Sequence, residues 1–387
     1  MRILLLTEFF PDFGKITFTG GVEARTFYTA LFLSKNHQVF VIARRKKGQE
    51  KREIRKNLTI IRVGTETEGS LATFSSILNR LTFTILAFFR GIKLNVDVIE
   101  GSNYVSFIPA FLIGILKKIP KVAWYPDTLI GKWRKYFGLV GFLGEVSERI
   151  FFKLSWDKII TISPAVKKRL VKKGFPSEKI KVIFCGVDQK AFKPFEKYKT
   201  KTLCVVSRLL PYKRVEDAIK ALAYINKQER AVLKIIGSGA EKENLLSLTK
   251  KMRILKRVKF YESIDQKRLA QILGRSHILI HPSIVEGFGI VLVEAASAGT
   301  PFIAADIPTS KMLAKKLKSG ILFEKKDAKD LAENISKLFK DKKLYEKMRK
   351  NGIENAKKFS WESLSKQTER VFIREGTDPL KGQSLAL

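Results

Sequence analysis

The sequence HPSIVEGFGIVLVEAASAGTPFIAAD (residues 281–306) holds the end of a strand, a glycine-rich turn and a helix. Its apolar spacing and its glycines predict these elements in that order: strand 277–283, turn 284–289, helix 290–299. Glu286 and Glu294 lie on either side of the helix start. Two carboxylates so placed suit the two ends of one elongated ligand, and two ordinary surface acids would share the spacing. The apolar residues around Glu294 favour the ligand interpretation.

Short β-branched segments alternate with longer helical patterns along the whole chain. RILLLTEF (2–9), the helical pattern 22–36 and HQVFVIARR (37–45) form a βαβ unit, which predicts a parallel sheet. The alternation begins again with TLCVVSRL (202–209). We therefore expect an α/β protein of two doubly wound, Rossmann-like domains that face each other across a cleft, with ligands beyond the carboxyl ends of the strands.

The predicted domain boundary follows a polar stretch that contains one proline. We expect an N-terminal, acceptor-side domain at residues 1–194 and a C-terminal, nucleotide-sugar-binding domain at 195–357. A last helix at 358–374 is expected to pack back on the first domain. The tail beyond Gly376 is expected to lack order.

The chain is strongly basic. Among its 387 residues are 74 Lys and Arg against 37 Asp and Glu, a formal net charge of +37. This excess implies a polyanionic partner, and the absence of any helix-turn-helix, zinc-finger or RRM-like signature argues against specific nucleic-acid binding. An anionic membrane surface and phosphorylated ligands remain as expected partners.

Several features point to the cytoplasm. Two cysteines in so long a chain make no disulfide framework, which predicts a reducing compartment. The opening MRILLLTEFF has the pattern of a strand rather than of a signal peptide, and no apolar run is long enough for a membrane span. We expect a cytoplasmic protein, either soluble or peripheral at the inner face of the membrane.

Five segments, in order, resemble the retaining glycosyltransferases of family 4, which have the GT-B fold. They are TGGVE (19–23), TISPAVKKRLVKKGFPSEKIKVIFCGVDQKAF (161–192), VVSRLLPYKRVEDAIKAL (205–222), the segment quoted first with its Glu-x7-Glu spacing, and FSWESL (359–364). The resemblance covers nearly the whole chain. It implies a hexosyltransferase that uses a nucleotide-diphosphate sugar as co-substrate, UDP- or GDP-linked, and no further cofactor.

The resemblance also implies roles for single residues. Arg208 and Lys213 would clamp the donor diphosphate, Glu286 would bind hydroxyls of the transferred sugar, and Glu294 would bind the ribose. Carboxylates suit hydroxyl groups because they accept charge-assisted hydrogen bonds, and paired cations suit a leaving diphosphate. The remaining expected donor contacts are Gly20, Gly21, Ile264, Phe288, Gly289, Ile290 and Val291. Glu262 stands where the family commonly has glycine, which weakens the prediction of the base pocket at Ile264.

No metal site is expected. Asp-x-Asp is absent, and His and Cys are too few for a ligand cluster. Where the family has a His-Asp pair after a strand, this chain has Tyr125-Pro126-Asp127, and Glu100 stands where another His is common. Asp127 would orient the acceptor or stabilise the anomeric carbon, while a donor phosphate oxygen takes the acceptor proton. His277 and His281 are expected to pack or cap.

Two stretches of the first domain suggest an acceptor near a membrane. FSSILNRLTFTILAFFRGIKL (74–94) is either a core helix with basic ends or an interfacial helix, and GKWRKYFGLVGFLG (131–144) has the composition of an acceptor loop. The leading hypothesis is metal-independent, retaining hexose transfer to a lipid-linked or saccharide acceptor, in glycan or glycolipid biosynthesis. The alternatives are a polyanion- or membrane-binding protein with a degenerate site, and a GT-B epimerase or phosphorylase.

Overall fold

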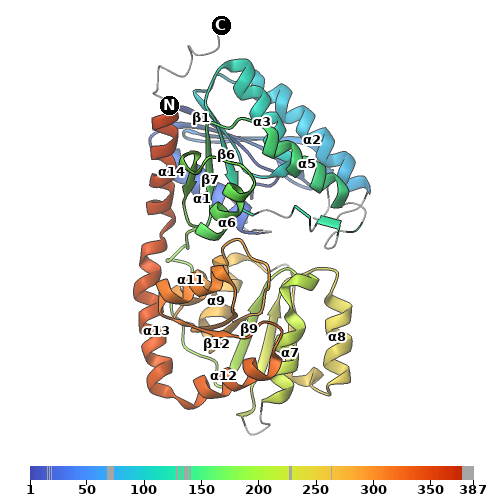
Figure 1. Ribbon diagram of the computed structural model, residues 1–387, viewed down its shortest axis with the longest axis vertical. Coiled ribbons are helices and arrows are strands. Elements are labelled where there is room, and N and C mark those ends of the chain that lie inside the picture. Colours follow the sequence, from blue (N-terminus) through green and yellow to red (C-terminus); the bar gives the residue numbers. More distant parts are fainter. Residues whose placement is uncertain are drawn as a thin grey trace. The chain divides into compact units, whose positions relative to one another are not determined.

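The computed structural model describes residues 1–14, 16, 18, 20–67, 74–127, 130–131, 133–134, 138, 141–225, 229–262 and 264–376 (Figure 1). The chain divides into two compact units. The first comprises Met1–Cys185 and Trp361–Leu387, and the second comprises Gly186–Ser360. The expected tail lies outside the described residues, as do Thr19 and six of the fourteen residues of the expected acceptor loop.

The first unit is built on a mostly parallel sheet. The strands are β1 (Arg2–Leu6), β2 (Gln38–Lys46), β3 (Arg52–Arg55), β4 (Leu58–Thr67), β5 (Val98–Gly101), β6 (Lys121–Tyr125), β7 (Lys158–Thr161) and β8 (Ile180–Val182). Their order is β3-β4-β2-β1-β5-β6-β7-β8, and only the β3–β4 pair within this described sheet is antiparallel. Residues 3–6 of β1 are fully buried, as expected for a central strand covered on both faces.

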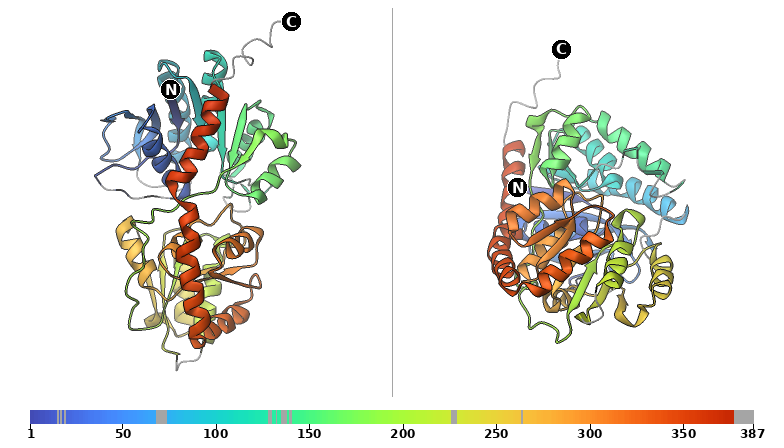
Figure 2. Two further views of the ribbon diagram at one scale, coloured as in Figure 1. Left: turned by 90° about the vertical axis from the view of Figure 1, so that its left-hand side faces the viewer. Right: turned by 60° about the horizontal axis from the view of Figure 1, so that its bottom comes forward.

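Helices cover this sheet. They are α1 (Gly21–Leu33), α2 (Phe74–Ile92), α3 (Tyr104–Lys117), α5 (Gly141–Lys153), α6 (Pro164–Lys172) and α14 (Trp361–Gly376), with the short turn η2 (Ser177–Lys179). α2, α3 and α5 pack as neighbours, and α14 packs along α1 (Figure 2). Tyr28 of α1 stacks on Trp361 with ring centroids 5.2 Å apart, so the C-terminal helix packs on α1 as part of the first unit.

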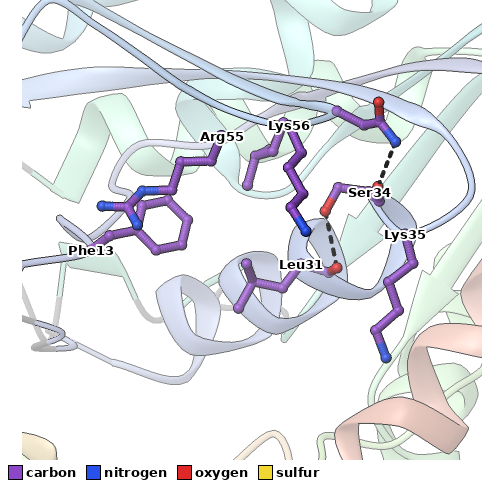
Figure 3. Close-up of a pocket in the computed structure, with 8 residues that line it drawn as sticks. Phe13, Leu31, Ser34, Lys35, Arg55 and Lys56 are labelled. Atoms are coloured by element: carbon purple, nitrogen blue, oxygen red, sulfur yellow. Dashed lines mark hydrogen bonds between the residues drawn. The ribbon is translucent and has the colours of Figure 1, made fainter.

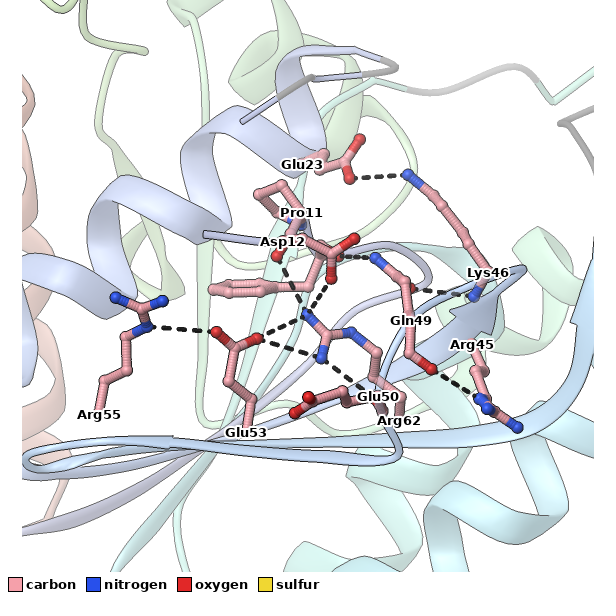
Figure 4. A network of polar contacts seen from close by, with 11 residues as sticks. Pro11, Asp12, Glu23, Arg45, Lys46, Gln49, Glu50, Glu53, Arg55 and Arg62 are labelled. Carbon is pink, nitrogen blue, oxygen red and sulfur yellow. Dashed lines mark hydrogen bonds and ion pairs between the residues drawn. The ribbon is translucent and has the colours of Figure 1, made fainter. Parts of the chain in front are cut away.

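A buried arginine fixes the loop that follows β1 (Figure 4). The Arg62 guanidinium donates to the Pro11 carbonyl at 3.2 Å and pairs with Asp12 at 3.1 Å and with Glu53 at 3.3 Å. Lys46 pairs with Glu23 in the first turn of α1 at 3.0 Å. These contacts tie the loop and the start of α1 to strands β2 to β4, so the α1 N-terminus is held at the carboxyl edge of the sheet.

The second unit is a six-stranded parallel sheet of order β11-β10-β9-β12-β13-β14. The strands are β9 (Thr202–Val206), β10 (Val232–Ile236), β11 (Val258–Tyr261), β12 (Ile278–His281), β13 (Phe302–Ala305) and β14 (Gly320–Phe323). The helices are α7 (Val215–Tyr224), α8 (Lys242–Lys251), α9 (Gln266–Arg275), α10 (Ile290–Ser297), α11 (Pro308–Leu317), α12 (Ala328–Lys340) and α13 (Lys342–Ala356), with the turns η3 (Pro211–Lys213), η5 (Leu255–Arg257) and η6 (Lys357–Phe359). One core of aliphatic residues from β9, β10, α7 and α12 holds the unit together.

The second unit begins at Gly186, earlier than the boundary at residue 195 that the sequence predicts. The Val187 backbone N–H donates to the Phe359 carbonyl at 2.8 Å, and the Ser297 hydroxyl donates to the Phe192 carbonyl at 2.6 Å. Residues 187–192 are therefore bonded to the second unit. Polarity of the stretch after residue 190 suggested the later boundary, but hydrogen bonding decides where a segment belongs.

Candidate active site

The carboxyl edge of the second sheet brings two predicted segments together. β9 and β12 are adjacent parallel strands, with Leu203 opposite Ile278 and Cys204 opposite Leu279. The loop after β9 carries the predicted cations, and the turn after β12 carries Glu286. Since parallel neighbours end at the same edge, side chains from these two loops meet there.

Lys213, Glu286 and His281 form the centre of this edge. The Lys213 Nζ lies 2.6 Å from Glu286 Oε2, and His281 Nε2 lies 3.3 Å from the same oxygen. All three side chains are at least four-fifths buried. The structure thus confines one carboxylate oxygen between two nitrogen groups, at the end of two neighbouring strands.

The environment keeps Glu286 ionised. Burial alone would raise its pKa, but the Lys213 ammonium and the His281 imidazole hold the pKa of this carboxyl well below its usual range. An ionised carboxylate accepts hydrogen bonds and donates none. Glu286 is therefore suited to bind hydroxyl groups and unsuited to act as a general acid.

Arg208 stands beside this cluster. Its Nη2 donates to the Tyr212 hydroxyl at 2.9 Å, and the Tyr212 carbonyl accepts from the Ile284 backbone N–H at 3.1 Å. Tyr212 therefore connects the cationic loop to the Glu286 turn. The Arg208 side chain is exposed, so its remaining N–H groups face solvent.

The turn between Glu286 and α10 requires glycine at one position. Gly289 has φ = +86°, in the left-handed region, and is the N-cap of α10. Phe288 is 2% exposed and packs on Phe359, so only its backbone is available to a ligand. Ile290 and Val291 are the first residues of α10, and N–H groups in a first turn have no partner within the helix. The turn therefore presents N–H groups suited to an anion.

Glu294 lies in α10, and most of its helical neighbours are buried. Burial raises the pKa of its carboxyl to about 7. No compensating charge contributes to this shift, in contrast to Glu286. A partly buried carboxyl with a raised pKa is a recurrent mark of a ligand site.

A second glycine loop packs against the cationic loop, and the sequence did not identify it. The Leu209 backbone N–H donates to the Ser238 carbonyl at 2.8 Å. A Cβ at Gly237 would lie 1.8 Å from the Ser207 carbonyl oxygen, and one at Gly239 would lie 2.2 Å from the Leu209 carbonyl oxygen. Side chains are therefore excluded from both positions, and the two loops fix each other.

Ile264 lies apart from the Lys213–Glu286 cluster. It follows β11, the edge strand, and is half-buried. Glu262, which precedes it, pairs with Lys242 at 3.1 Å. In the sheet, β10 lies between β11 and β9, and β12 lies beyond β9, so Ile264 follows a strand that is not adjacent to those that carry Lys213 and Glu286.

In the first unit, Gly20 and Gly21 begin α1. Gly20 is the N-cap with φ = 172°, extended backbone that any residue adopts, and a Cβ there would meet no atom of the described residues within 4 Å. Neither backbone strain nor crowding explains glycine at this position. A ligand that approaches the backbone closely would explain it, because only glycine leaves the N–H groups of the helix start fully accessible.

Asp127 follows β6 and is ion-paired. The Arg169 guanidinium of α6 donates to Asp127 Oδ1, and the Tyr104 hydroxyl donates to the Asp127 carbonyl at 2.7 Å. The ring of Tyr104 meets Trp133 edge-on at 4.9 Å. Asp127 is thus held at the carboxyl edge of the first sheet, among aromatic residues, with its carboxylate already engaged.

Glu100 has a structural role. It is fully buried, and the Arg25 guanidinium donates to both of its oxygens, at 2.9 Å for Nη2. The Ser102 hydroxyl donates to Glu100 at 3.0 Å, and Arg25 lies 5.0 Å from the Trp124 ring centroid. A carboxylate so enclosed is unavailable to an acceptor. Glu100 therefore does not take over the role of the histidine that the family commonly has at this position.

A pocket on the first unit lies elsewhere. It has a volume of about 660 Å³ and is lined by Phe13, Leu31, Ser34, Lys35, Arg55, Lys56, Asn57 and Leu58 (Figure 3). Asn57 and Leu58 stand at the amino end of β4. Ligands of parallel sheets bind at carboxyl ends, so this pocket is not part of the candidate site.

Among the described residues, no cluster of His, Cys, Asp and Glu is arranged to hold a metal ion. Of the helices in the described part of the chain, none combines the length and apolarity that crossing a bilayer needs.

The sequence matches two family models. Residues 186–355 match the model of glycosyl transferases group 1, and residues 19–190 match that of glycosyltransferase family 4. Among curated proteins, the chain is 25% identical over 377 residues to the phosphatidylinositol N-acetylglucosaminyltransferase gpi3 subunit of Schizosaccharomyces pombe, which covers 94% of this chain and 78% of that protein.

Solved structures have the same fold. Sucrose-phosphate synthase of Thermosynechococcus elongatus superposes with a TM-score of 0.81 at 19% identity, covering 96% of this chain and 98% of that one. The HepE protein of Anabaena, in complex with UDP-glucose, gives 0.76 at 17% identity, covering 97% and 100%. The family resemblance found in the sequence is confirmed, and so is the predicted α/β fold class. The chain belongs to glycosyltransferase family 4 and is a hexosyltransferase with the GT-B fold.

Proposed function

We propose that this chain transfers a hexose from a nucleotide-diphosphate sugar to a lipid-linked or saccharide acceptor, with retention at the anomeric carbon and without a metal ion. The observation that carries the proposal is the Lys213–Glu286–His281 cluster at the carboxyl edge of the second sheet. It supplies one cation for a diphosphate and one ionised carboxylate for sugar hydroxyls.

The donor would lie along this edge. Lys213 and Arg208 would neutralise the diphosphate, the first-turn N–H groups of α10 would bind phosphate or sugar oxygens, and Glu286 would accept from hydroxyls of the hexose. Glu294, one turn into α10, would accept from the ribose hydroxyls. Ile264 would contribute to the base pocket.

The cationic groups would promote bond breaking. As the bond between the anomeric carbon and the β-phosphate oxygen breaks, negative charge grows on the diphosphate, and a preorganised ammonium stabilises it. The acceptor hydroxyl forms the new bond on the same face and passes its proton to the departing phosphate oxygen. This route needs no protein base, which fits a chain in which Glu100 is enclosed and Asp127 is paired.

Asp127, Gly20 and Gly21 complete the proposal on the first unit. Asp127 would orient the acceptor when the Arg169 pair opens, and the backbone at Gly20 and Gly21 would approach the donor phosphate or the acceptor. UDP is the first nucleotide to test, because HepE was solved with UDP-glucose, and a lipid acceptor is suggested by the phosphatidylinositol named for the fission yeast relative. A lipid acceptor would place the protein at the cytoplasmic face of a membrane.

A two-stage experiment tests the proposal. The first stage screens UDP-, GDP- and ADP-sugars for thermal stabilisation, since a ligand of the native state raises the midpoint according to its affinity. The second compares donor turnover by the wild type and by Glu286→Gln, which should lose about 100-fold or more. Glu243→Gln, an exposed acid on α8, is the matched control.

The product distinguishes the alternatives. Retained anomeric configuration in a new glycoside, formed in the presence of a metal chelator, supports the proposal. An isomerised sugar indicates an epimerase, and a sugar phosphate formed from inorganic phosphate indicates a phosphorylase. Unchanged turnover by Glu286→Gln would contradict the role assigned to Glu286.

A further inference from the structure

Exposed apolar side chains are concentrated on three neighbouring helices of the first unit. Of the sixteen large hydrophobic side chains that are exposed among the described residues, eleven lie there: five on α2, three on α3 and three on α5. Those on α2 are Leu78, Leu81, Ile85, Leu86 and Phe89; those on α3 are Leu112, Ile115 and Leu116; those on α5 are Phe142, Leu143 and Ile150. We call these eleven residues the apolar face.

The three helices are adjacent, so the residues of the apolar face lie on one layer of the first unit. α3 packs against both α2 and α5. Figure 1 shows the three running side by side along the first unit, in cyan to green. On a soluble protein, single exposed apolar residues are ordinary, whereas a group of this size on one layer marks an interaction surface.

The pattern of α2 supports this conclusion. Phe83 and Ala87 are fully buried, and α2 packs against β4 and α3. Leu81, Ile85 and Phe89 recur at helical spacing on another face and are 56%, 55% and 56% exposed. A surface helix normally carries polar residues opposite its buried stripe, so α2 has a second apolar stripe that the first unit leaves uncovered.

The charges around the apolar face are positive. Residues 74–118 contain five Lys and Arg (Arg80, Arg90, Lys93, Lys117 and Lys118) and two acids, Asp97 and Glu100. Asp97 pairs with Arg2 at 2.7 Å, and Glu100 is buried against Arg25. On α5, Glu145 pairs with Arg149 at 2.9 Å. Arg80 in turn pairs with Glu8 at 2.8 Å, and Glu148 of α5 is fully buried, so the cations left to act beside the apolar face include Arg90, Lys93, Lys117 and Lys118.

We infer that the apolar face docks the protein on an anionic lipid surface, with its leucine, isoleucine and phenylalanine side chains in the interfacial region and the flanking cations on lipid headgroups. Apolar area and attraction to anionic lipid act together in such binding. A second copy of the chain fits less well, since a two-fold interface would bring the same cations against one another. This inference stands independently of the transfer reaction, because docking needs no donor.

The test is co-sedimentation of the full chain with vesicles. One set contains equal parts of phosphatidylglycerol and phosphatidylcholine, the other phosphatidylcholine alone, at low salt and at about 0.15 M salt. The wild type should bind the anionic vesicles preferentially, and less so at the higher salt. Lack of preference for anionic vesicles at low salt would overturn the inference.

Two variants and their controls locate the surface. The triple variant Leu81→Gln, Ile85→Gln and Phe89→Gln should lower vesicle affinity by about 100-fold, since three half-exposed side chains lose their apolar contact with lipid. Its control is Tyr224→Gln with Leu255→Gln, exposed apolar residues of the second unit, which should bind as the wild type does. Unchanged binding by the triple variant would overturn the inference.

Charge is tested in the same way. Arg90→Gln with Lys93→Gln should lower affinity for anionic vesicles by about fivefold for each cation. Lys250→Gln with Lys251→Gln, in exposed positions at the end of α8, removes the same charge from the second unit and should change binding little.

Two readouts distinguish docking on lipid from misfolding and from self-association. Thermal stabilisation by the best nucleotide sugar should be equal in the wild type and the triple variant, which shows that the fold and the donor site are intact. Light scattering gives the oligomeric state. If the wild type is a dimer that does not bind vesicles, and the triple variant is a monomer, the apolar face is an interface between two copies of the chain. The inference of docking on lipid would then be wrong.

Discussion

Glu294→Gln tests the most unusual electrostatic feature of the candidate site. Burial raises the pKa of the Glu294 carboxyl from its ordinary value of 4.5 to about 7. Between about pH 4.5 and pH 7, the folded protein keeps a proton that the unfolded chain has released. Stability therefore falls as pH rises through this window, and the loss is complete above pH 7. Its upper limit is about 3 kcal/mol, and the partial exposure of Glu294 reduces it.

Glutamine removes this loss, because it carries no charge at any of these pH values. In the free protein, the unfolding free energy of Glu294→Gln should match that of the wild type near pH 4.5 and exceed it by about 1–3 kcal/mol at pH 8. Donor affinity should change in the opposite direction. A neutral amide replaces a charge-assisted acceptor for the ribose hydroxyls, which should weaken nucleotide-sugar binding by about 10- to 100-fold.

Urea denaturation at pH 5, 6, 7 and 8, followed by a signal from the second unit, measures the stability difference. Isothermal titration with the best donor from the sugar panel measures the affinity. Glu243→Gln is the control for loss of one negative charge at an exposed site of the same unit. A stability difference that stays constant from pH 5 to pH 8 would show that Glu294 is not a carboxyl with a raised pKa, and the electrostatic reasoning would be refuted.

The remaining predictions concern His281, the turn at Gly289, and two ion pairs of the first unit. His281→Leu should lower donor turnover by about 10- to 100-fold through loss of one contact to the Glu286 carboxylate, and His281→Asn should restore part of it in a steady-state assay. Gly289→Ala should cost about 1–2 kcal/mol of unfolding free energy, because alanine is strained at this positive φ; an unchanged urea midpoint would contradict the turn geometry. Glu100→Gln should destabilise the first unit by about 3–5 kcal/mol by leaving Arg25 buried without its charge partner, whereas Asp97→Asn, at a pair about one-third exposed, should cost at most about 1 kcal/mol in the same denaturation experiment.

Much of the fold follows from local sequence. The βαβ pattern of residues 2–45 predicts a parallel sheet, and β1 and β2 pair in parallel with Leu4 opposite Phe40. Periodicity does not reveal strand order, so the adjacency of β9 and β12 appears only in the structure. That adjacency is what brings Lys213 and Glu286 together.

As with the fold, local sequence predicts single residues of the candidate site but not which of them lie in contact. The resemblance to the family predicts Glu286 and Lys213 as donor-binding residues, whereas the sequence predicts only packing or capping for His281, because one His at a strand end has no distinguishing pattern. Its contact with Glu286 depends on the turn that returns the chain to the end of β12. The Arg169–Asp127 pair was missed for a related reason, since the two residues come from different elements of the first unit.

The apolar face shows where sequence periodicity stops being informative. The pattern of residues 74–94 allowed either a core helix or an interfacial helix, and α2 has features of both: Phe83 and Ala87 are buried, and Leu81, Ile85 and Phe89 are exposed. Helical spacing identifies apolar stripes, but neighbouring elements decide which stripe they cover. Here α3 and the sheet cover one stripe of α2 and leave the other open. The same layer then adds exposed residues from α3 and α5, so a surface fit for lipid arises from three segments of which only one has a suggestive helical pattern.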